Sequence, residues 1–316
     1  MRIYMRRRAG FRAPRGGHVI DLQKAISQGS PVPVSVDGVF GQQSETALAA
    51  WQARNGLTPS GMVDELSWNT ATAQSLPSYF RRCLAITAAF EGHGYTFAAG
   101  NWDNAYLTWG VVGFTLKGGN LGKVIKTIHE RHPQLLRDTI GDAKTDELLE
   151  IIDASATRKR DWGNSISLPP SKYRIRGDWE DAFRLIGERR EVRVIQDEIA
   201  RSVYWRQAVK DLRRYGKPTE ADAALFFDTA VQNGSVNAEK AEKIEAALAA
   251  NPGVDGRDRL MLIARAIAAG SNPDFHDDVL SRRATIASGQ GTVHGSAYKI
   301  EDWFVDYVEV EDASLD

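Results

Sequence analysis

One segment, residues 79–91, most limits the folds open to this chain, because its side chains are apolar nearly all round a helix. Such a helix belongs in the core of a domain rather than at its surface. Leu84 and Ala88 lie at helical spacing from Glu91 and share a face with it. Gly92 follows, where a left-handed residue commonly ends a helix. We therefore expect a carboxyl group at the C-terminal end of a buried helix.

The length and composition describe an ordinary globular chain. It has 316 residues, 42% of them apolar and 26% charged, with a formal net charge of −1. This length predicts two domains. The near-zero charge argues against nucleic acid as a partner. No apolar run approaches the roughly 20 residues of a membrane helix, so we expect no stable membrane insertion.

The charge is unevenly distributed along the chain. Residues 1–16 form a basic segment without an acid, and the last sixteen residues are rich in acids. One interpretation is two solvated tails. The other is that the arginines attract an anionic surface such as a cell wall or lipid headgroups. These arginines are Arg2, Arg6, Arg7, Arg8, Arg12 and Arg15.

The cysteine and histidine residues of the sequence predict neither a metal site nor a disulfide. Cys83 is the only cysteine, so it can form no internal disulfide and no cysteine-based metal site. His93, His129, His132 and His276 lack metal-site spacing and an HExxH pattern. We therefore expect no metal and no cofactor. The N-terminus lacks the apolar region of a secretory signal, which predicts that the protein stays in the cytoplasm where it is made.

The sequence of residues 17–75 predicts a small helical module. Apolar residues at helical spacing over 19–26 predict a first helix, and a glycine- and aspartate-rich turn follows at 36–41. A second helix is expected from Ser44 to the Asn55-Gly56 pair. Asp64 can cap a short third helix.

This module resembles the peptidoglycan-binding type-1 domain. The resemblance implies a three-helix bundle that recognises the bacterial cell wall, with Asp37, Phe40, Trp51 and Trp68 as candidate wall-binding residues. Ser67 departs mildly from the threonine that usually precedes the tryptophan, and the alternative is an unrelated three-helix bundle. The matching residues are Val19, Leu22, Gln23, Val36-Asp37-Gly38, Phe40-Gly41, Thr46, Trp51-Gln52, Gly56-Leu57, Gly61-Met62-Val63 and Trp68.

The remainder, 79–316, is predicted to be one mainly helical domain. The exception is segment 94–116, whose aromatic, glycine and β-branched residues predict one small sheet. A single small sheet beside many helices fits an α+β domain. Helices are expected at 79–91, 121–131, 144–153, 179–213, 219–232, 237–250, 256–269 and 274–287.

Two carboxylates near the start of this domain suggest glycosidic chemistry. Glu91 lies at a buried helix C-terminus, where both burial and the helix dipole favour the protonated acid. Asp103 falls in a turn-like cluster, where it should be solvated and ionised. A proton donor and an ionised carboxylate are what glycoside hydrolysis requires. The alternatives are a solvated glutamate at a frayed helix end and an aspartate that only forms a turn.

The following segment resembles the core of the chitosanase family within the lysozyme-like superfamily. The similar residues are Asp103, Tyr106, Thr108 and the string 110–115 (Gly-Val-Val-Gly-Phe-Thr). The resemblance implies that Glu91 is the general acid, Asp103 the general base, and Thr108 the residue that positions the attacking water. The glutamate-to-aspartate gap is shorter than in chitosanases and nearer to that of phage lysozymes. From the residues alone, either Thr108 or Thr115 could help to hold a water, but the interpretation as two ordinary strand threonines is favoured.

A second point of similarity lies in segment 224–234, a buried helix that contains Asp228. Chitosanases carry an aspartate in a like helix, joined to an arginine network behind the catalytic glutamate. Arg282 or Arg283 could supply the arginine here, and we name Arg283 with Asp228 as the supporting network. The alternative is a pair that only stabilises the core. Segment 289–295 also looks like a loop of wall hydrolases, and no role is assigned to His294.

Together, the two resemblances indicate a modular phage-type endolysin. The leading hypothesis is an inverting muramidase, which requires its two carboxyl groups to be about 6.5–9.5 Å apart. The alternatives are a chitosanase, a lytic transglycosylase that uses Glu91 alone, and a non-catalytic wall-binding or virion protein. We expect peptidoglycan as the partner, a holin for release from the host cytoplasm to the periplasm and wall, and a monomer.

Overall fold

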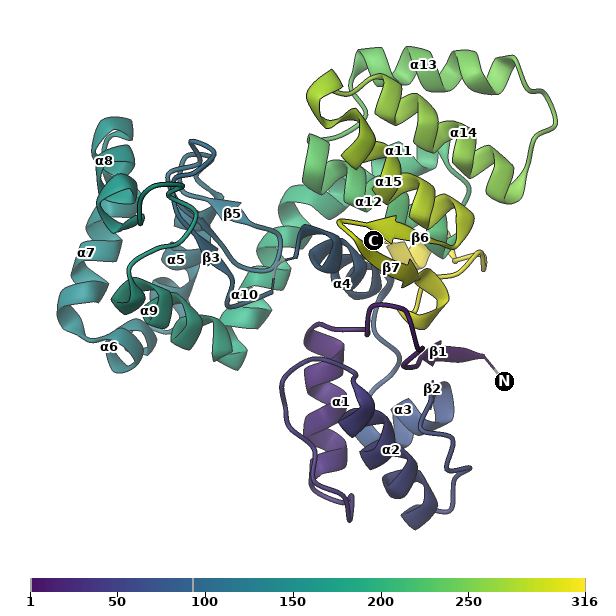
Figure 1. The fold of residues 1–316 in the computed structure, drawn as a ribbon, viewed down its shortest axis with the longest axis horizontal. Coiled ribbons are helices and arrows are strands. Elements are labelled where there is room, and N and C mark those ends of the chain that lie inside the picture. The colour runs from purple at the N-terminus through teal and green to yellow at the C-terminus, as the bar shows by residue number, and fades with distance from the viewer. Residues whose placement is uncertain (1, 93, 316) are drawn as a thin grey trace. The chain divides into compact units, whose positions relative to one another are not determined.

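The computed structural model describes residues 2–92 and 94–315, which form a mainly helical structure with three small sheets. The chain divides into two compact units. The first unit contains Met1–Phe90 and Tyr204–Asp316, and the second contains Glu91–Val203 (Figure 1). The chain therefore passes between the units immediately before Glu91, and passes back next to Tyr204.

The predicted three-helix bundle lies at the N-terminal end of the first unit. Its helices are α1 (Gly17–Ser27), α2 (Gln42–Arg54) and α3 (Glu65–Thr72). The cap predicted for the third helix is present, because the Asp64 side chain accepts a hydrogen bond from the backbone N–H of Ser67 at 2.7 Å. The second helix begins two residues before the predicted start.

A buried glutamine fixes the turn between the first two helices. The Oε1 atom of Gln23 accepts from the N–H of Gly38, which has a left-handed backbone conformation. Its Nε2 atom donates to the Val39 carbonyl and to the Ser44 hydroxyl. All the polar groups of this side chain are thus used inside the bundle, where an unpaired amide would be costly.

The turn before the third helix repeats this arrangement. Gln52 accepts from the N–H of left-handed Gly61 and donates to the Met62 carbonyl and the Ser67 hydroxyl. Two glutamines on successive helices therefore perform the same task on successive turns. This gives a physical reason for the glutamine and glycine positions in the motif of residues 17–75.

The bundle shares its core with the C-terminal part of the chain. Phe304 is fully buried in this core, and its ring contacts the rings of His18 and Trp68 at centroid distances of 5.1 and 5.8 Å. Strand β1 (Ile3–Met5) pairs with β2 (Val63–Asp64) of the bundle. The backbone N–H of Phe304 also donates to a carbonyl of this N-terminal strand. The module is therefore built into the first unit rather than tethered to it.

The expectation of two solvated, charged tails is wrong. Arg6 and Arg8 both form ion pairs with Glu301 and with Asp302, which is almost fully buried. Opposite charges at the two ends of the chain attract each other because folding brings the ends together. Two further arginines, Arg2 and Arg82, converge on the buried carboxylate of Glu220.

The rest of the first unit is helical. Helix α4 (Tyr79–Glu91) has the predicted bounds and is buried over most of its length. The hairpin β6 (Gln290–Val293) and β7 (Ser296–Lys299) was not predicted, because its four-residue strands lack a clear alternation of apolar residues. The remaining helices are α11 (Arg206–Tyr215), α12 (Glu220–Asn233), α13 (Ala238–Ala249), α14 (Gly256–Ala269) and α15 (His276–Ser288).

The second unit contains the predicted sheet. Strands β3 (Ala98–Ala99), β4 (Thr108–Trp109) and β5 (Phe114–Thr115) form an antiparallel sheet in chain order, within the expected segment 94–116. Figure 1 shows this sheet among the helices of the unit. These helices are α5 (Asn120–Arg131), α6 (Leu135–Ile140), α7 (Asp142–Asp153), α8 (Ala156–Ile166), α9 (Gly177–Glu188) and α10 (Arg190–Ala200).

The observed helices differ from the predicted ones at two places in the second half of the second unit. The single helix predicted over 179–213 is broken at Arg189, which is extended, and continues through a π-helical turn at Arg201–Trp205 into α11. Arginine and glutamate favour helices, so propensity gave no sign of the break. Helix α8 was missed, although Ser155 caps it by accepting from the N–H of Arg158.

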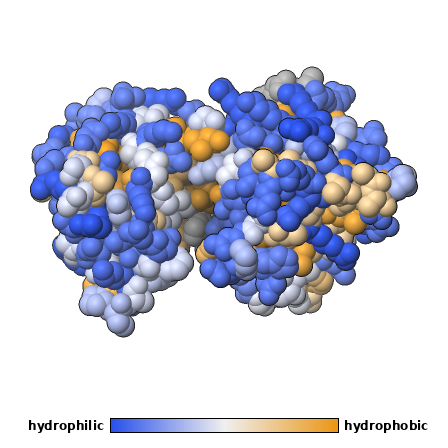
Figure 2. All heavy atoms as spheres, turned by 90° about the horizontal axis from the view of Figure 1, so that it is seen from above, coloured by the Kyte–Doolittle hydropathy of each residue, from blue (hydrophilic) through white to orange (hydrophobic). Residues whose placement is uncertain are grey.

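Hydrophilic side chains cover most of the surface in view (Figure 2). Among the described residues, no helix combines the length and apolar character needed to cross a bilayer. The largest exposed apolar side chains are scattered along the chain and include Leu66, Trp102, Tyr173 and Phe275.

The position of Phe304 predicts a large stability effect. Replacing Phe304 with alanine leaves a cavity in the bundle core, and we expect the free energy of unfolding to fall by about 3–5 kcal/mol. Denaturant titration followed by tryptophan fluorescence measures this, with exposed Val308→Ala as a control expected within about 0.5 kcal/mol of wild type. Equal stability of F304A and V308A would contradict the shared core.

Candidate functional site

Glu91 is the last residue of α4 and the first residue of the second unit. The side chain is half-buried, whereas the ten residues before it include only one that is not buried. Gly92 has φ +71°, so the helix ends on a left-handed glycine as the sequence predicts. The structure thus places a carboxyl group at the C-terminal end of a buried helix.

Asp103 lies in a tightly hydrogen-bonded loop. One of its oxygens accepts from the N–H of Ala105 at 3.0 Å, and Asn101 accepts from the N–H of Tyr106 at 2.9 Å. Asn104 and Tyr106 both have positive φ. Asp103 therefore does form a turn, as the alternative interpretation held, and its side chain is exposed to solvent.

Thr108 is fixed by the register of the sheet. It pairs with Ala99 on one side and with Thr115 on the other. Its neighbour Trp109 is fully buried and donates from its indole N–H to the Phe183 carbonyl. Successive residues of a strand face opposite sides, and Thr108 is itself buried, with 8% of its surface exposed.

The turn after Thr108 depends on a glutamine that the sequence did not single out. Buried Gln196 accepts from the N–H of Val111 at 2.9 Å and donates to the Tyr95 carbonyl at 3.0 Å. A Cβ at Gly110 would lie 2.5 Å from Oε1 of this side chain, so the turn has room only for glycine there. Gln196 therefore joins the segment after Glu91 to the segment after Thr108.

The predicted pair of Asp228 and an arginine exists and includes both candidate arginines. Asp228 is fully buried on α12, 2.5 Å from Arg282 and 2.8 Å from Arg283, both of which are buried on α15. Burial by itself would raise the pKa of Asp228, but the two guanidinium groups outweigh burial and hold that pKa below its usual range. The contact was predicted, whereas its influence on catalysis stays a prediction.

The candidate wall-binding residues fall into two groups. Phe40, Trp51 and Trp68 are buried in the bundle core, so the prediction that their side chains contact the wall is wrong. These aromatic residues belong to the motif because they pack the three helices together. Asp37 is exposed, but its carboxylate accepts from Gln23 and so also supports a turn.

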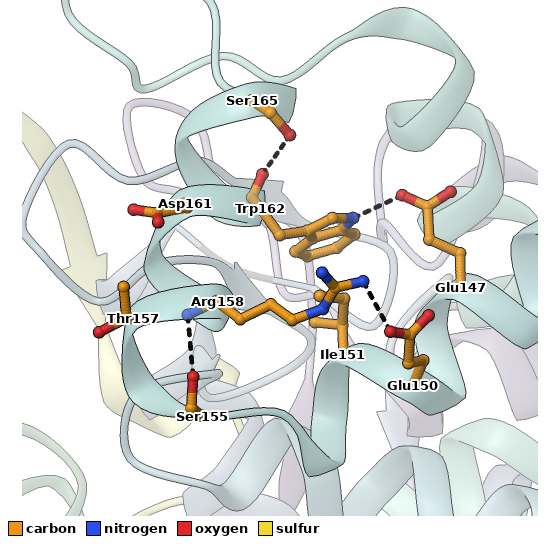
Figure 3. A pocket seen from close by; sticks show the side chains of 9 residues that line it. All are labelled: Glu147, Glu150, Ile151, Ser155, Thr157, Arg158, Asp161, Trp162 and Ser165. Carbon is orange, nitrogen blue, oxygen red and sulfur yellow. Dashed lines mark hydrogen bonds and ion pairs between the residues drawn. The ribbon is translucent and has the colours of Figure 1, made fainter.

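A hollow of about 580 Å³ lies on α7 and α8 of the second unit, away in sequence from every predicted site residue (Figure 3). Its carboxylates are already engaged: Glu147 accepts from the Trp162 indole N–H, and Glu150 pairs with Arg158. Figure 3 shows these groups turned toward one another across the hollow. They therefore stabilise the packing of the two helices.

The structure describes three of the four histidines considered as metal ligands, and His93 lies outside the described residues. His129 and His132 are at the end of α5, and His276 is at the start of α15, where it pairs with Asp277. Over residues 2–92 and 94–315, no group of three His, Cys, Asp or Glu side chains could hold a metal ion. Cys83 is buried, and burial raises the pKa of its thiol.

Residues 15–70 match the family model described as "Putative peptidoglycan binding domain". This match agrees with the resemblance found in residues 17–75. No curated protein has a matching sequence.

Solved chitosanase structures are similar in part to this fold. One is a family 46 glycoside hydrolase from Gynuella sunshinyii in complex with chitotetraose, 16% identical, with a TM-score of 0.47 over 71% of this chain and 98% of that one. Another is a mutant chitosanase from Bacillus subtilis MY002 complexed with 6 GlcN, 17% identical, with a TM-score of 0.49 over the same shares of the two chains.

The buried cluster predicts a pH-dependent stability. Asp228→Asn leaves two buried guanidinium groups without a carboxylate, and we expect a loss of about 3–5 kcal/mol in the free energy of unfolding near pH 7. The low pKa of Asp228 stabilises the folded state above the unfolded value of about 4, and this contribution is lost as the pH falls through the folded value. The difference in the free energy of unfolding between wild type and D228N should therefore become smaller below about pH 4.

Acid unfolding curves of both proteins measure this gap. His18, whose burial lowers its pKa to about 3, destabilises both proteins equally as the pH falls below about 6.5, so it cancels in the difference. Exposed Asp161→Asn is the matched control and should change stability by less than about 1 kcal/mol. A gap that stays constant from pH 7 to pH 2 would contradict an ionised Asp228.

Proposed function

We propose that this protein is a glycoside hydrolase that cleaves the glycan strands of bacterial peptidoglycan. The observation that carries the proposal is the match of residues 15–70 to a peptidoglycan-binding family. That module shares its core with Phe304 in the same compact unit that contains nearly all of α4. The chain would bind the wall through this module, and it carries a carboxyl group, that of Glu91, at the end of α4.

The contrast between two carboxyl groups supports an acid–base mechanism. Glu91 is half-buried at a helix C-terminus and Asp103 is exposed in a loop, so the two carboxyl groups lie in contrasting surroundings. Glu91 protonates the glycosidic oxygen as its bond to the anomeric carbon breaks. Asp103 takes a proton from a water that attacks this carbon from the opposite face, with Thr108 holding the water. The products are two sugar ends with inversion at the anomeric carbon.

Exposed aromatic rings beside Asp103 support a carbohydrate substrate. Trp102 is 55% exposed and Tyr173 is 46% exposed, with ring centroids 5.8 Å apart. Large exposed aromatic side chains that lie together commonly mark a binding surface. Sugar rings have apolar faces that pack on such rings, and Trp102 precedes Asp103 in the chain.

For the biological role, we propose an endolysin of phage type with muramidase specificity. It would act as a monomer on the wall after release from the host cytoplasm by a holin. Three other outcomes would assign a different function. Anhydro-sugar products would indicate a lytic transglycosylase, and cleavage of chitosan but not peptidoglycan would indicate a chitosanase. Wall binding without cleavage of either polymer would indicate a binding or virion protein.

The mechanism predicts that both carboxyl groups are needed. In digests of purified peptidoglycan, wild type should release reducing muramic-acid ends, and Glu91→Gln and Asp103→Asn should each lower the rate by about 10²–10⁴-fold. Mass analysis of the released sugars is the measurement. The control Asp161→Asn removes an exposed carboxylate elsewhere in the second unit and should retain full activity. Activity of D103N near that of wild type would exclude the two-carboxylate mechanism.

The aromatic pair predicts a separate effect on binding. Trp102→Ala removes an apolar surface for a sugar ring without touching a carboxyl group, so KM should rise by about tenfold for a loss near 1.4 kcal/mol, with kcat little changed. Steady-state kinetics on soluble glycan fragments measure both constants. The control Phe275→Ala removes an equally exposed ring in the first unit and should leave KM unchanged. An unchanged KM in W102A would exclude this pair from the substrate site.

A further inference from the structure

The turn of the β6–β7 hairpin holds an unusual residue. His294 and Gly295 form a two-residue loop, since Val293 pairs directly with Ser296. Both loop residues have positive φ, +48° and +73°. Such turns favour asparagine followed by glycine, because most side chains are strained in this conformation. Histidine is among the residue types that adopt positive φ more readily than most, so the turn accommodates His294, and the informative feature is what its side chain contacts.

The His294 side chain reaches the end of α4. Its Nδ1 atom lies 2.9 Å from the carbonyl oxygen of Phe90, the residue before Glu91. A carbonyl oxygen can only accept, so Nδ1 donates this bond. The last carbonyls of a helix have no partner within the helix, and a side chain that donates to them fixes the helix end.

Tyr298 of the same hairpin binds the neighbouring carbonyl. Its hydroxyl donates to the Ala89 carbonyl at 3.0 Å, and its ring meets the Phe90 ring edge-on at 4.9 Å. Tyr298 is nearly fully buried. Figure 1 shows the hairpin beside the end of α4. The two carbonyls that precede Glu91 are therefore both bound by one hairpin.

A continuous set of polar contacts joins this hairpin to the buried ion cluster. The Nε2 atom of His294 lies 2.6 Å from Asp278, which accepts from the Gln232 amide. The side-chain Oε1 atom of Gln232 accepts from Arg283, which pairs with Asp228. The guanidinium of Arg282 also lies 5.7 Å from the Phe90 ring centre. His294 thus has a fixed partner on each side.

We propose that His294 and Tyr298 are positioning residues for Glu91. They bind the backbone carbonyls of Phe90 and Ala89, the two residues before Glu91. The Glu91 side chain therefore projects from the helix end in one fixed direction. The set of contacts through Asp278, Gln232 and Arg283 fixes the His294 ring in turn. This inference rests on the proposed function, since it assigns a role in the reaction of Glu91.

The decisive variant is His294→Asn, because asparagine suits the backbone of this turn. A shorter asparagine side chain cannot span from Asp278 to the Phe90 carbonyl. We expect the melting temperature of H294N to be unchanged or raised, KM to be unchanged, and kcat to fall by at least tenfold, since small misplacements of a reacting group can cost about a hundredfold. Tyr298→Phe, which removes only the hydroxyl, should lower kcat in the same way.

Two controls separate positioning from general stability. Thr292→Ala alters an exposed side chain of the same hairpin and should leave kcat and KM unchanged. His294→Gln, whose longer side chain can donate to the Phe90 carbonyl, should recover part of the kcat lost in H294N. Full kcat in H294N, or a loss of kcat matched by a loss of melting temperature, would overturn the proposal.

Carbonyl ¹³C chemical shifts give a readout that needs no substrate. The Phe90 carbonyl should shift in H294N and the Ala89 carbonyl in Y298F, and unchanged shifts in both variants would show that the hairpin does not bind the helix end. Wild-type protein that cleaves no glycan would remove the proposed function and the positioning role with it. Altered shifts in that case would still show the contact, so the two failures are distinguishable.

Discussion

The buried cluster of Asp228 with Arg282 and Arg283 is the interaction on which the first unit depends. Three charges without water are costly, and they are tolerated because the carboxylate faces both guanidinium groups at hydrogen-bonding distance. The cluster fixes α12 against α15, and through Gln232 and Asp278 it continues to the hairpin that binds the end of α4. The ion cluster and the hairpin that binds the end of α4 are therefore parts of one set of contacts within the first unit.

The three-helix module of residues 17–75 is integrated into the first unit by two different kinds of interaction. Burial of Phe304 in the bundle core supplies apolar contact, and the ion pairs of Arg6 and Arg8 with Asp302 supply charge complementarity around it. Both involve the segment before the matched domain: the Tyr4 carbonyl accepts from the N–H of Phe304, and Arg6 and Arg8 follow strand β1 in the chain. The segment that looks like a basic tail is thus the element that joins the module to the remainder of the unit.

Much of the local structure was predictable because its causes are local. The bounds of α4, the Asp64 cap and the small sheet around Thr108 follow from side-chain periodicity and from residues adjacent in the chain. Two of the failures had no local signal. Nothing near Arg189 indicates a helix break, and nothing near His294 indicates that its partner is the carbonyl of Phe90. Phe40, Trp51 and Trp68 were misassigned because a motif does not say whether an aromatic residue faces the core or the solvent.

The sequence by itself determined the helical class, the wall-binding resemblance, and the candidates Glu91, Asp103 and Thr108, since each depends on residue types at short spacing. Only the tertiary structure decided that both Arg282 and Arg283 bind Asp228, that Gln196 holds the turn after Thr108, and that the two charged ends neutralise each other. Each of these contacts spans at least fifty residues of chain. The partners in each contact are determined by tertiary packing, and a local sequence pattern does not predict them.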